Sequence, residues 1–125
     1  MKSEWKALCK APEMSVEDAG VVVTFHDQRK HRVAVTDGDD DLLLQAVVAR
    51  PSIVRDIGHA LSVTAWLRNR SVALVGFRID EKERLICEAV VPKAGLTADE
   101  FQFHLRTVAV EADRFEYALT GRDAE

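Results

Sequence analysis

The feature that most constrains the fold is the segment from Val90 to Gly121, which carries two interleaved rows of apolar residues. Thr97 followed by Glu100 has the spacing of a capping box, in which each side chain accepts a hydrogen bond from the other residue's backbone N–H. Gly121 stands where a glycine commonly caps the C-terminal end of a helix. The segment therefore predicts one long helix beginning after Thr97.

The two rows on this helix have different requirements. A helical wheel predicts that one broad arc faces a sheet, and this arc contains Phe101, Leu105, Val108, Ala109, Ala112, Phe115 and Leu119. Phe103, Val110 and Tyr117 recur every seven residues outside that arc. Two explanations remain open: an N-terminal segment with Trp5 and Leu8 packs on this second row within the monomer, or these five residues contribute to a partner surface.

The chain before this helix alternates between strand and helix patterns. The β-branched runs "GVVVTFHD" and "RVAVTDG", joined by "QRKH", predict a hairpin, Leu42 to Arg50 a third strand, and "VALVGFRID" with "RLICEAVVP" a second hairpin. "SEWKALCK" predicts a short first helix, and Ser52 to Asn69 a middle helix. The predicted order is α-βββ-α-ββ-α, an α+β fold with an antiparallel sheet packed by helices, as a single domain over residues 1–125.

The middle helix places a tryptophan among polar residues. The predicted core face contains Ile53, Val54, Ile57, Ala60, Leu61, Ala65 and Leu67, whereas Trp66 lies away from it beside His59, Ser62, Val63 and Arg70. Tryptophan, arginine and histidine around a small apolar residue are typical of protein interfaces, although a neighbouring loop covering Trp66 is the alternative. We expect these five residues to form a dimer or partner interface.

Composition limits the classes of partner. Of the 125 residues, 47% are hydrophobic, and 17 basic against 21 acidic side chains give a net charge of −4, which disfavours broad binding to nucleic acid or anionic membranes. The apolar runs are far shorter than the roughly 20 residues of a membrane helix. The charged N-terminus lacks the pattern of a secretory signal, so we expect a cytoplasmic protein.

The sequence contains no recognisable catalytic, cofactor or metal motif. Cys9 and Cys87 lack CxxC spacing. The run "TDGDDDL" begins like a calcium loop, but Leu42 and Val48 occupy the positions that require glycine and a bidentate glutamate. We therefore expect no cofactor, no metal and no enzymatic activity.

The segment "HDQRKHR" is the one basic cluster of the sequence. His26 and His31 flank the predicted turn without a third ligand nearby, so they are interpreted as surface histidines. A nucleic-acid-associated regulatory protein that contacts phosphates through Arg29, Lys30, His31 and Arg32 is the alternative function.

The C-terminal stretch "RIDEKERLICEAVVPKAGLTADEFQFHLRTVAVEADRFEYAL", together with the element order, resembles the YbjN family and the related type III secretion chaperone fold. The resemblance lies in a charged hairpin leading into "LICEAVVP", the short link "KAGLT", and "EF" with "VAVEADRFEYAL" on the closing helix. It implies a domain that dimerises through the middle helix, here His59, Val63 and Trp66, and that binds an extended partner segment over apolar grooves. The function this implies is a non-catalytic, dimeric protein- or peptide-binding module, chaperone-like or a stress or regulatory adaptor.

Overall fold

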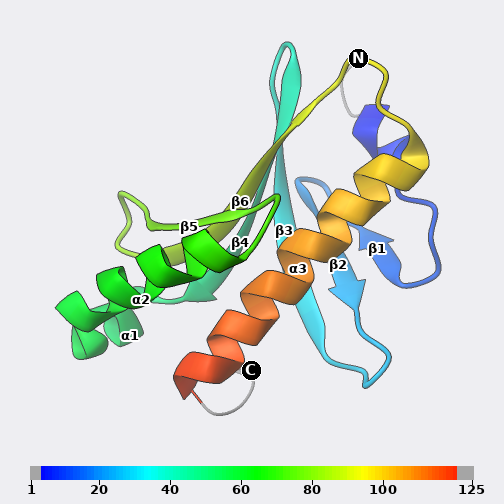
Figure 1. Ribbon diagram of the computed structural model, residues 1–125. Helices are drawn as coiled ribbons and strands as arrows, with labels where there is room; N and C mark the ends of the chain where they lie inside the picture. The colour runs from blue at the N-terminus through cyan, green and yellow to red at the C-terminus, as the bar shows by residue number, and fades with distance from the viewer. Residues whose placement is uncertain (1–3, 121–125) are drawn as a thin grey trace.

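The computed structural model of the protein describes residues 4–120 (Figure 1). A 3-10 helix, η1 (Glu4–Leu8), is followed by strands β1 (Met14–Val16), β2 (Gly20–Thr24), β3 (Lys30–Asp37) and β4 (Asp41–Ala49). Helices α1 (Pro51–Ile57) and α2 (His59–Ser71) precede strands β5 (Gly76–Ile79) and β6 (Leu85–Pro92), and the long helix α3 (Ala98–Thr120) follows. The predicted α+β class is confirmed.

The six strands form one antiparallel sheet in the order β1-β2-β3-β4-β6-β5. Helix α3 runs diagonally across one face and contacts β2, β3, β4 and β6, while α2 packs at the end of the sheet beside β5 (Figure 1). The core lies between the sheet and α3. The extent of the domain, residues 1–125, stays a prediction.

The periodicity of the strands and of α3 explains which side chains form this core. Along β4, the alternate residues Leu42, Leu44, Ala46 and Val48 are all buried, because successive side chains point to opposite faces of a sheet. The predicted arc of α3 is buried on the same side, with Leu119 half-buried at its end. Each buried leucine or phenylalanine contributes about 1.5–3 kcal/mol relative to exposure.

The predicted capping box is present at the start of α3. The Thr97 N–H donates to Glu100 Oε1 at 3.1 Å, and the Glu100 N–H donates to Thr97 Oγ1 at 3.2 Å. These bonds fix the start of the helix shortly after β6, so that Phe101 begins the buried arc. The predicted cap Gly121 lies outside the described residues.

The helices before α3 differ from the prediction. The first helix is a short 3-10 helix, and the middle helix is divided at Gly58, whose φ of 73° and ψ of −145° end α1. Only glycine adopts such a conformation without strain. The division changes the helical phase, so that Leu67 is 50% exposed instead of buried in the core.

The strands also differ in number and length. Four strands, not three, precede the middle helix, because Met14–Val16 pairs with β2 as an edge strand. A three-residue strand with one buried side chain leaves little alternation for sequence reasoning to detect. The predicted strand over "VALVGFRID" is shorter, since β5 begins at Gly76.

Candidate protein-binding surface

The predicted interface residues of the middle helix form one exposed stripe along α2. His59, Ser62, Val63, Trp66 and Arg70, hereafter the α2 stripe, are all exposed and follow the i, i+3, i+4 spacing of a single helix face. The Trp66 side chain is 59% exposed, and the Arg70 guanidinium lies 5.1 Å from its ring centroid. No loop among residues 4–120 covers Trp66.

The opposite side of α2 fixes the direction of this stripe. Leu61 and Ala65, one turn apart, are the buried residues of the helix. Arg68 lies over the ring of Phe115 on α3, with its guanidinium 4.5 Å from the ring centroid. Because these contacts hold one face of α2 against the domain, the α2 stripe points away from it.

The second row of α3 is exposed as well. Phe103 and Tyr117 are each 53% exposed, and Val110 between them is half-buried. These three residues, hereafter the α3 row, lie on the side of the helix away from the buried arc. The position of the N-terminal segment decides between the two explanations that the sequence left open for the α3 row.

The N-terminal segment packs elsewhere. Trp5 is buried and its ring meets Phe101 edge to face, with ring centroids 6.5 Å apart, and the Leu8 carbonyl accepts a hydrogen bond from Gln102 Nε2 at 2.8 Å. Trp5 therefore belongs to the core rather than to an exposed partner surface, and Leu8 is half-buried. The segment leaves Phe103 exposed.

A surface hollow adjoins Phe103 and extends the apolar area. It measures about 450 Å³ and is lined by Leu74, Val91, Pro92, Ala94, Leu96, Glu100, Phe103 and His104. Leu74 comes from the loop between α2 and β5, is 54% exposed and has a φ of 76°. A leucine in the left-handed region is strained, so this exposed side chain is held at an energetic cost. Sequence reasoning missed Leu74, since φ has no signature in the sequence.

The two arginines of the predicted basic cluster form ion pairs with acidic residues. Arg29 pairs with Asp27 and with Asp113 on α3, and Arg32 pairs with Glu17. The interpretation of His31 as a surface histidine is wrong, because its side chain is 9% exposed and points toward α3. Lys30 is exposed. Nucleic-acid binding through this cluster stays a prediction.

Cys9, Cys87 and Lys93 lack the lowered pKa that activates a nucleophile. Burial raises the pKa of Cys9 to about 11, and burial, followed by the negative charge of Glu111 and then Glu88, raises that of Cys87 to about 12, so both remain protonated thiols. The Lys93 ammonium donates to Asp37, which raises its pKa, whereas an amine nucleophile requires a lowered one.

The fold defines the class of protein. One similar solved structure is a chain of the ExsC-ExsE complex (20% identity, 93% of this chain and 88% of that chain, TM-score 0.59). Another belongs to the heterodimeric ExoU-SpcU complex from the type III secretion system of Pseudomonas aeruginosa (16% identity, 98% of this chain and 100% of that chain, TM-score 0.59). A third belongs to the structure of the Yersinia pestis type III secretion chaperone SycH with a stable fragment of YscM2 (10% identity, 89% of this chain and 98% of that chain, TM-score 0.54). The protein has the α+β fold of type III secretion chaperones.

The sequence identifies the family within this fold class. The model of the YbjN family, described as "Putative bacterial sensory transduction regulator", matches residues 3–120. The chain belongs to the YbjN family, as its C-terminal sequence pattern predicts. No curated protein matches the sequence significantly. Within residues 4–120, none of the helices has both the length and the apolar character needed to span a bilayer.

Proposed function

We propose that this protein is a cytoplasmic, non-catalytic, homodimeric module that binds a protein or peptide as a chaperone-like or regulatory adaptor. The observation that carries the proposal is the exposure of large apolar side chains on two helices whose opposite faces complete the core. Trp66 on α2, and Phe103 and Tyr117 on α3, are each more than half exposed. Such a concentration on two defined helix faces is typical of interaction surfaces.

The α2 stripe supports the homodimer. Tryptophan and arginine are the residues that most often dominate the binding energy of an interface, and here Arg70 lies over the ring of Trp66. In a twofold contact the same face meets itself, so two antiparallel copies of α2 place Arg70 of one copy near His59 of the other. Helix α2 contains no acidic residue that could pair with Arg70 of the other copy. His59 lies at the N-terminal end of α2 and Arg70 near its C-terminal end. An antiparallel crossing near Val63 and Trp66 therefore avoids opposing two arginines.

The α3 row supports a second partner. Phe103 and Leu74 line the same hollow, so an aromatic side chain of α3 and an aliphatic side chain of the neighbouring loop share one apolar area. Apolar pockets along a groove accept alternate side chains of an extended segment. Similar structures were solved as complexes with another protein, among them the HopA1-SchA chaperone-effector complex. An extended peptide with apolar side chains is the partner that this surface fits.

The dimer is tested by sedimentation velocity at micromolar concentration. We expect the wild-type protein to sediment as a dimer and Trp66→Glu as a monomer, because a charge at the centre of the contact is desolvated without a partner. The matched control is Val90→Glu, since Val90 is 60% exposed on the sheet face opposite α3. A monomeric wild-type protein, or equal loss of the dimer in the Val90→Glu control, would contradict the assignment to α2.

The partner surface is tested by capturing proteins from the native lysate with tagged protein and identifying them by mass spectrometry. We expect a defined partner to be lost with Phe103→Glu and with Tyr117→Glu but retained with Val90→Glu. Far-UV circular dichroism must first show that every variant is folded. The same set of proteins bound to all variants would remove the physical basis for a binding role of the α3 row.

A further inference from the structure

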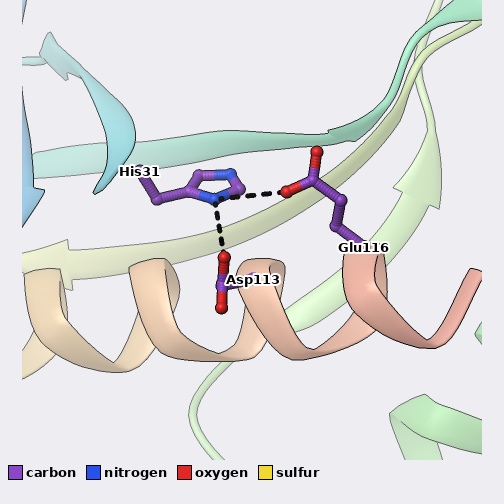
Figure 2. Close-up of side chains that lie close together, drawn as sticks. All are labelled: His31, Asp113 and Glu116. Carbon is purple, nitrogen blue, oxygen red and sulfur yellow. Dashed lines mark ion pairs between the residues drawn. The ribbon is translucent and has the colours of Figure 1, made fainter. Parts of the chain in front are cut away.

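Three ligand-bearing side chains from distant parts of the sequence meet between the sheet and α3. His31 on β3 faces Asp113 and Glu116, which lie three residues apart on one side of α3 (Figure 2). His31 Nδ1 is 3.9 Å from Asp113 Oδ1 and 3.8 Å from Glu116 Oε1. The side chains of His31 and Asp113 are 9% and 7% exposed, and that of Glu116 is 14% exposed. The cluster is therefore well shielded from water.

The other ring nitrogen of His31 determines which atom faces the carboxylates. His31 Nε2 lies 2.9 Å from the carbonyl oxygen of Val47, which is an acceptor only, so Nε2 carries the hydrogen. In the neutral ring the lone pair is then on Nδ1, directed at the two carboxylates. A ring N–H held by a backbone carbonyl is the arrangement that orients histidine ligands in metal sites.

The distances distinguish a metal from a proton between these groups. A proton shared by an imidazolium and a carboxylate gives N···O distances of about 2.7–2.9 Å. Two donors of a tetrahedral zinc ion, with bonds of about 2.0–2.2 Å, are roughly 3.4 Å apart. The observed 3.8 and 3.9 Å exceed the hydrogen-bond range by about 1 Å, whereas a contraction of about 0.5 Å brings each of these two pairs to the zinc spacing. All three ligand atoms lie within 4.8 Å of one another.

Arg29 orients Asp113 within the cluster through an ion pair. Its Nη2 lies 2.7 Å from Asp113 Oδ2, so the two oxygens of Asp113 are divided between Arg29 and the side facing His31. The carboxylate of Glu116 also faces His31 Nδ1, at 3.8 Å. The two carboxylates attract a cation at His31 Nδ1, and the Arg29 guanidinium weakens this attraction.

We propose that His31 Nδ1, Asp113 Oδ1 and Glu116 Oε1 bind a divalent first-row transition-metal ion, with Zn²⁺ as the best match. Imidazole favours Zn²⁺ over Mg²⁺ or Ca²⁺, and carboxylate oxygens complete the kind of ligand set that Zn²⁺ accepts. Water supplies the remaining position. The ion ties the beginning of β3 to the C-terminal half of α3, and this role is independent of partner binding.

Calorimetric titration of tag-free protein with ZnCl₂ tests the proposal. We expect one ion to bind per chain and the affinity to fall by roughly tenfold or more in His31→Gln and in Glu116→Gln. His59→Gln and Glu81→Gln are matched controls, because His59 lies on the exposed α2 stripe and Glu81 is exposed in the turn between β5 and β6. Both controls should bind Zn²⁺ as the wild-type protein does.

Nuclear magnetic resonance of the histidine rings gives a second readout that needs no variant. We expect Zn²⁺ to shift the His31 Nδ1 resonance while Nε2 keeps its hydrogen. Absence of binding at millimolar Zn²⁺, binding unchanged in both ligand variants, or a His31 ring that responds to pH but not to Zn²⁺ would overturn the proposal. If either ligand variant fails to fold, the wild-type ring resonances decide the question.

Discussion

The side-chain amide of Asn69 on α2 forms two hydrogen bonds with the backbone of Phe77 on β5. The Phe77 N–H donates to Asn69 Oδ1 at 2.7 Å, and Asn69 Nδ2 donates to the Phe77 carbonyl at 3.0 Å. The asparagine amide thus occupies the place of a neighbouring strand at the outer edge of β5. A covered edge resists pairing with another chain, and the same contact fixes α2 against the sheet.

Asn69→Ala is therefore expected to destabilise the protein by about 1–2 kcal/mol, because two backbone groups lose their partner. The free energy of unfolding in urea measures the effect. Thr64→Ala on the same helix is the control, since the Thr64 hydroxyl bonds only the Ala60 carbonyl one turn earlier, and its change should stay within about 0.5 kcal/mol. Equal effects of the two variants would show that the Asn69 contact does not stabilise α2.

The different environments of Trp5 and Phe103 give a second prediction. Trp5 is 5% exposed in the core, whereas Phe103 is 53% exposed on α3. We expect Trp5→Ala to cost roughly 3–5 kcal/mol and Phe103→Ala less than about 0.5 kcal/mol. Thermal and urea unfolding check both values. A large loss with Phe103→Ala would instead show that Phe103 is covered in solution.

Local chemistry explains why much of the fold was predictable. The capping box of Thr97 and Glu100 involves residues three positions apart, and the buried arc of α3 follows from a single helical period. The exposure of Trp66 also follows from its phase relative to Leu61 and Ala65. Where one periodic element decides a feature, the sequence contains the necessary information.

Features that join distant segments were not predictable in the same way. Trp5 reaches Phe101 through the tertiary fold, and His31 meets Asp113 only because β3 lies beneath α3. The conformation of Gly58, which divides the middle helix, lies within a segment whose composition is otherwise helical. A single sequence specifies neither the pairing of distant faces nor a backbone angle at one glycine.

The strained backbone of Leu74 gives a third prediction. Its φ of 76° costs a leucine about 1–2 kcal/mol. Glycine adopts this angle without strain, but it makes the unfolded chain more flexible and so loses more conformational entropy on folding. We expect Leu74→Gly to raise the free energy of unfolding by about 0.5–1 kcal/mol. Urea unfolding measures this gain.

Leu74→Ala separates the side chain from the backbone. Alanine removes most of the side chain beside Phe103 but keeps the strain, so it should not raise stability. If Leu74 contributes to the proposed partner surface, both variants should weaken capture of the partner to a similar degree. A partner retained fully by both would leave the strain at Leu74 without a binding role.

The turn between β5 and β6 predicts a specific pH dependence. Burial raises the pKa of Asp80, but hydrogen bonds from the Arg84 guanidinium and then from the Arg84 and Lys82 N–H groups outweigh burial and lower the pKa below its ordinary 3.8. A carboxyl group with a lower pKa in the folded state binds its proton more readily when unfolded. Its contribution to stability is therefore complete above the unfolded pKa and is lost as the pH falls through the folded pKa.

Asp80→Asn tests this dependence, because the amide keeps the shape of the side chain but loses the charge that pairs with Arg84. At pH 7 we expect the variant to be less stable by about 1–3 kcal/mol, since the buried acceptor of Arg84 is weakened. Urea unfolding at pH 7, 4, 3 and 2 should show the difference between the two proteins unchanged well above pH 4 and shrinking as the pH falls below it. A difference that stays constant down to pH 2 would mean that the charge of Asp80 is not what stabilises the turn.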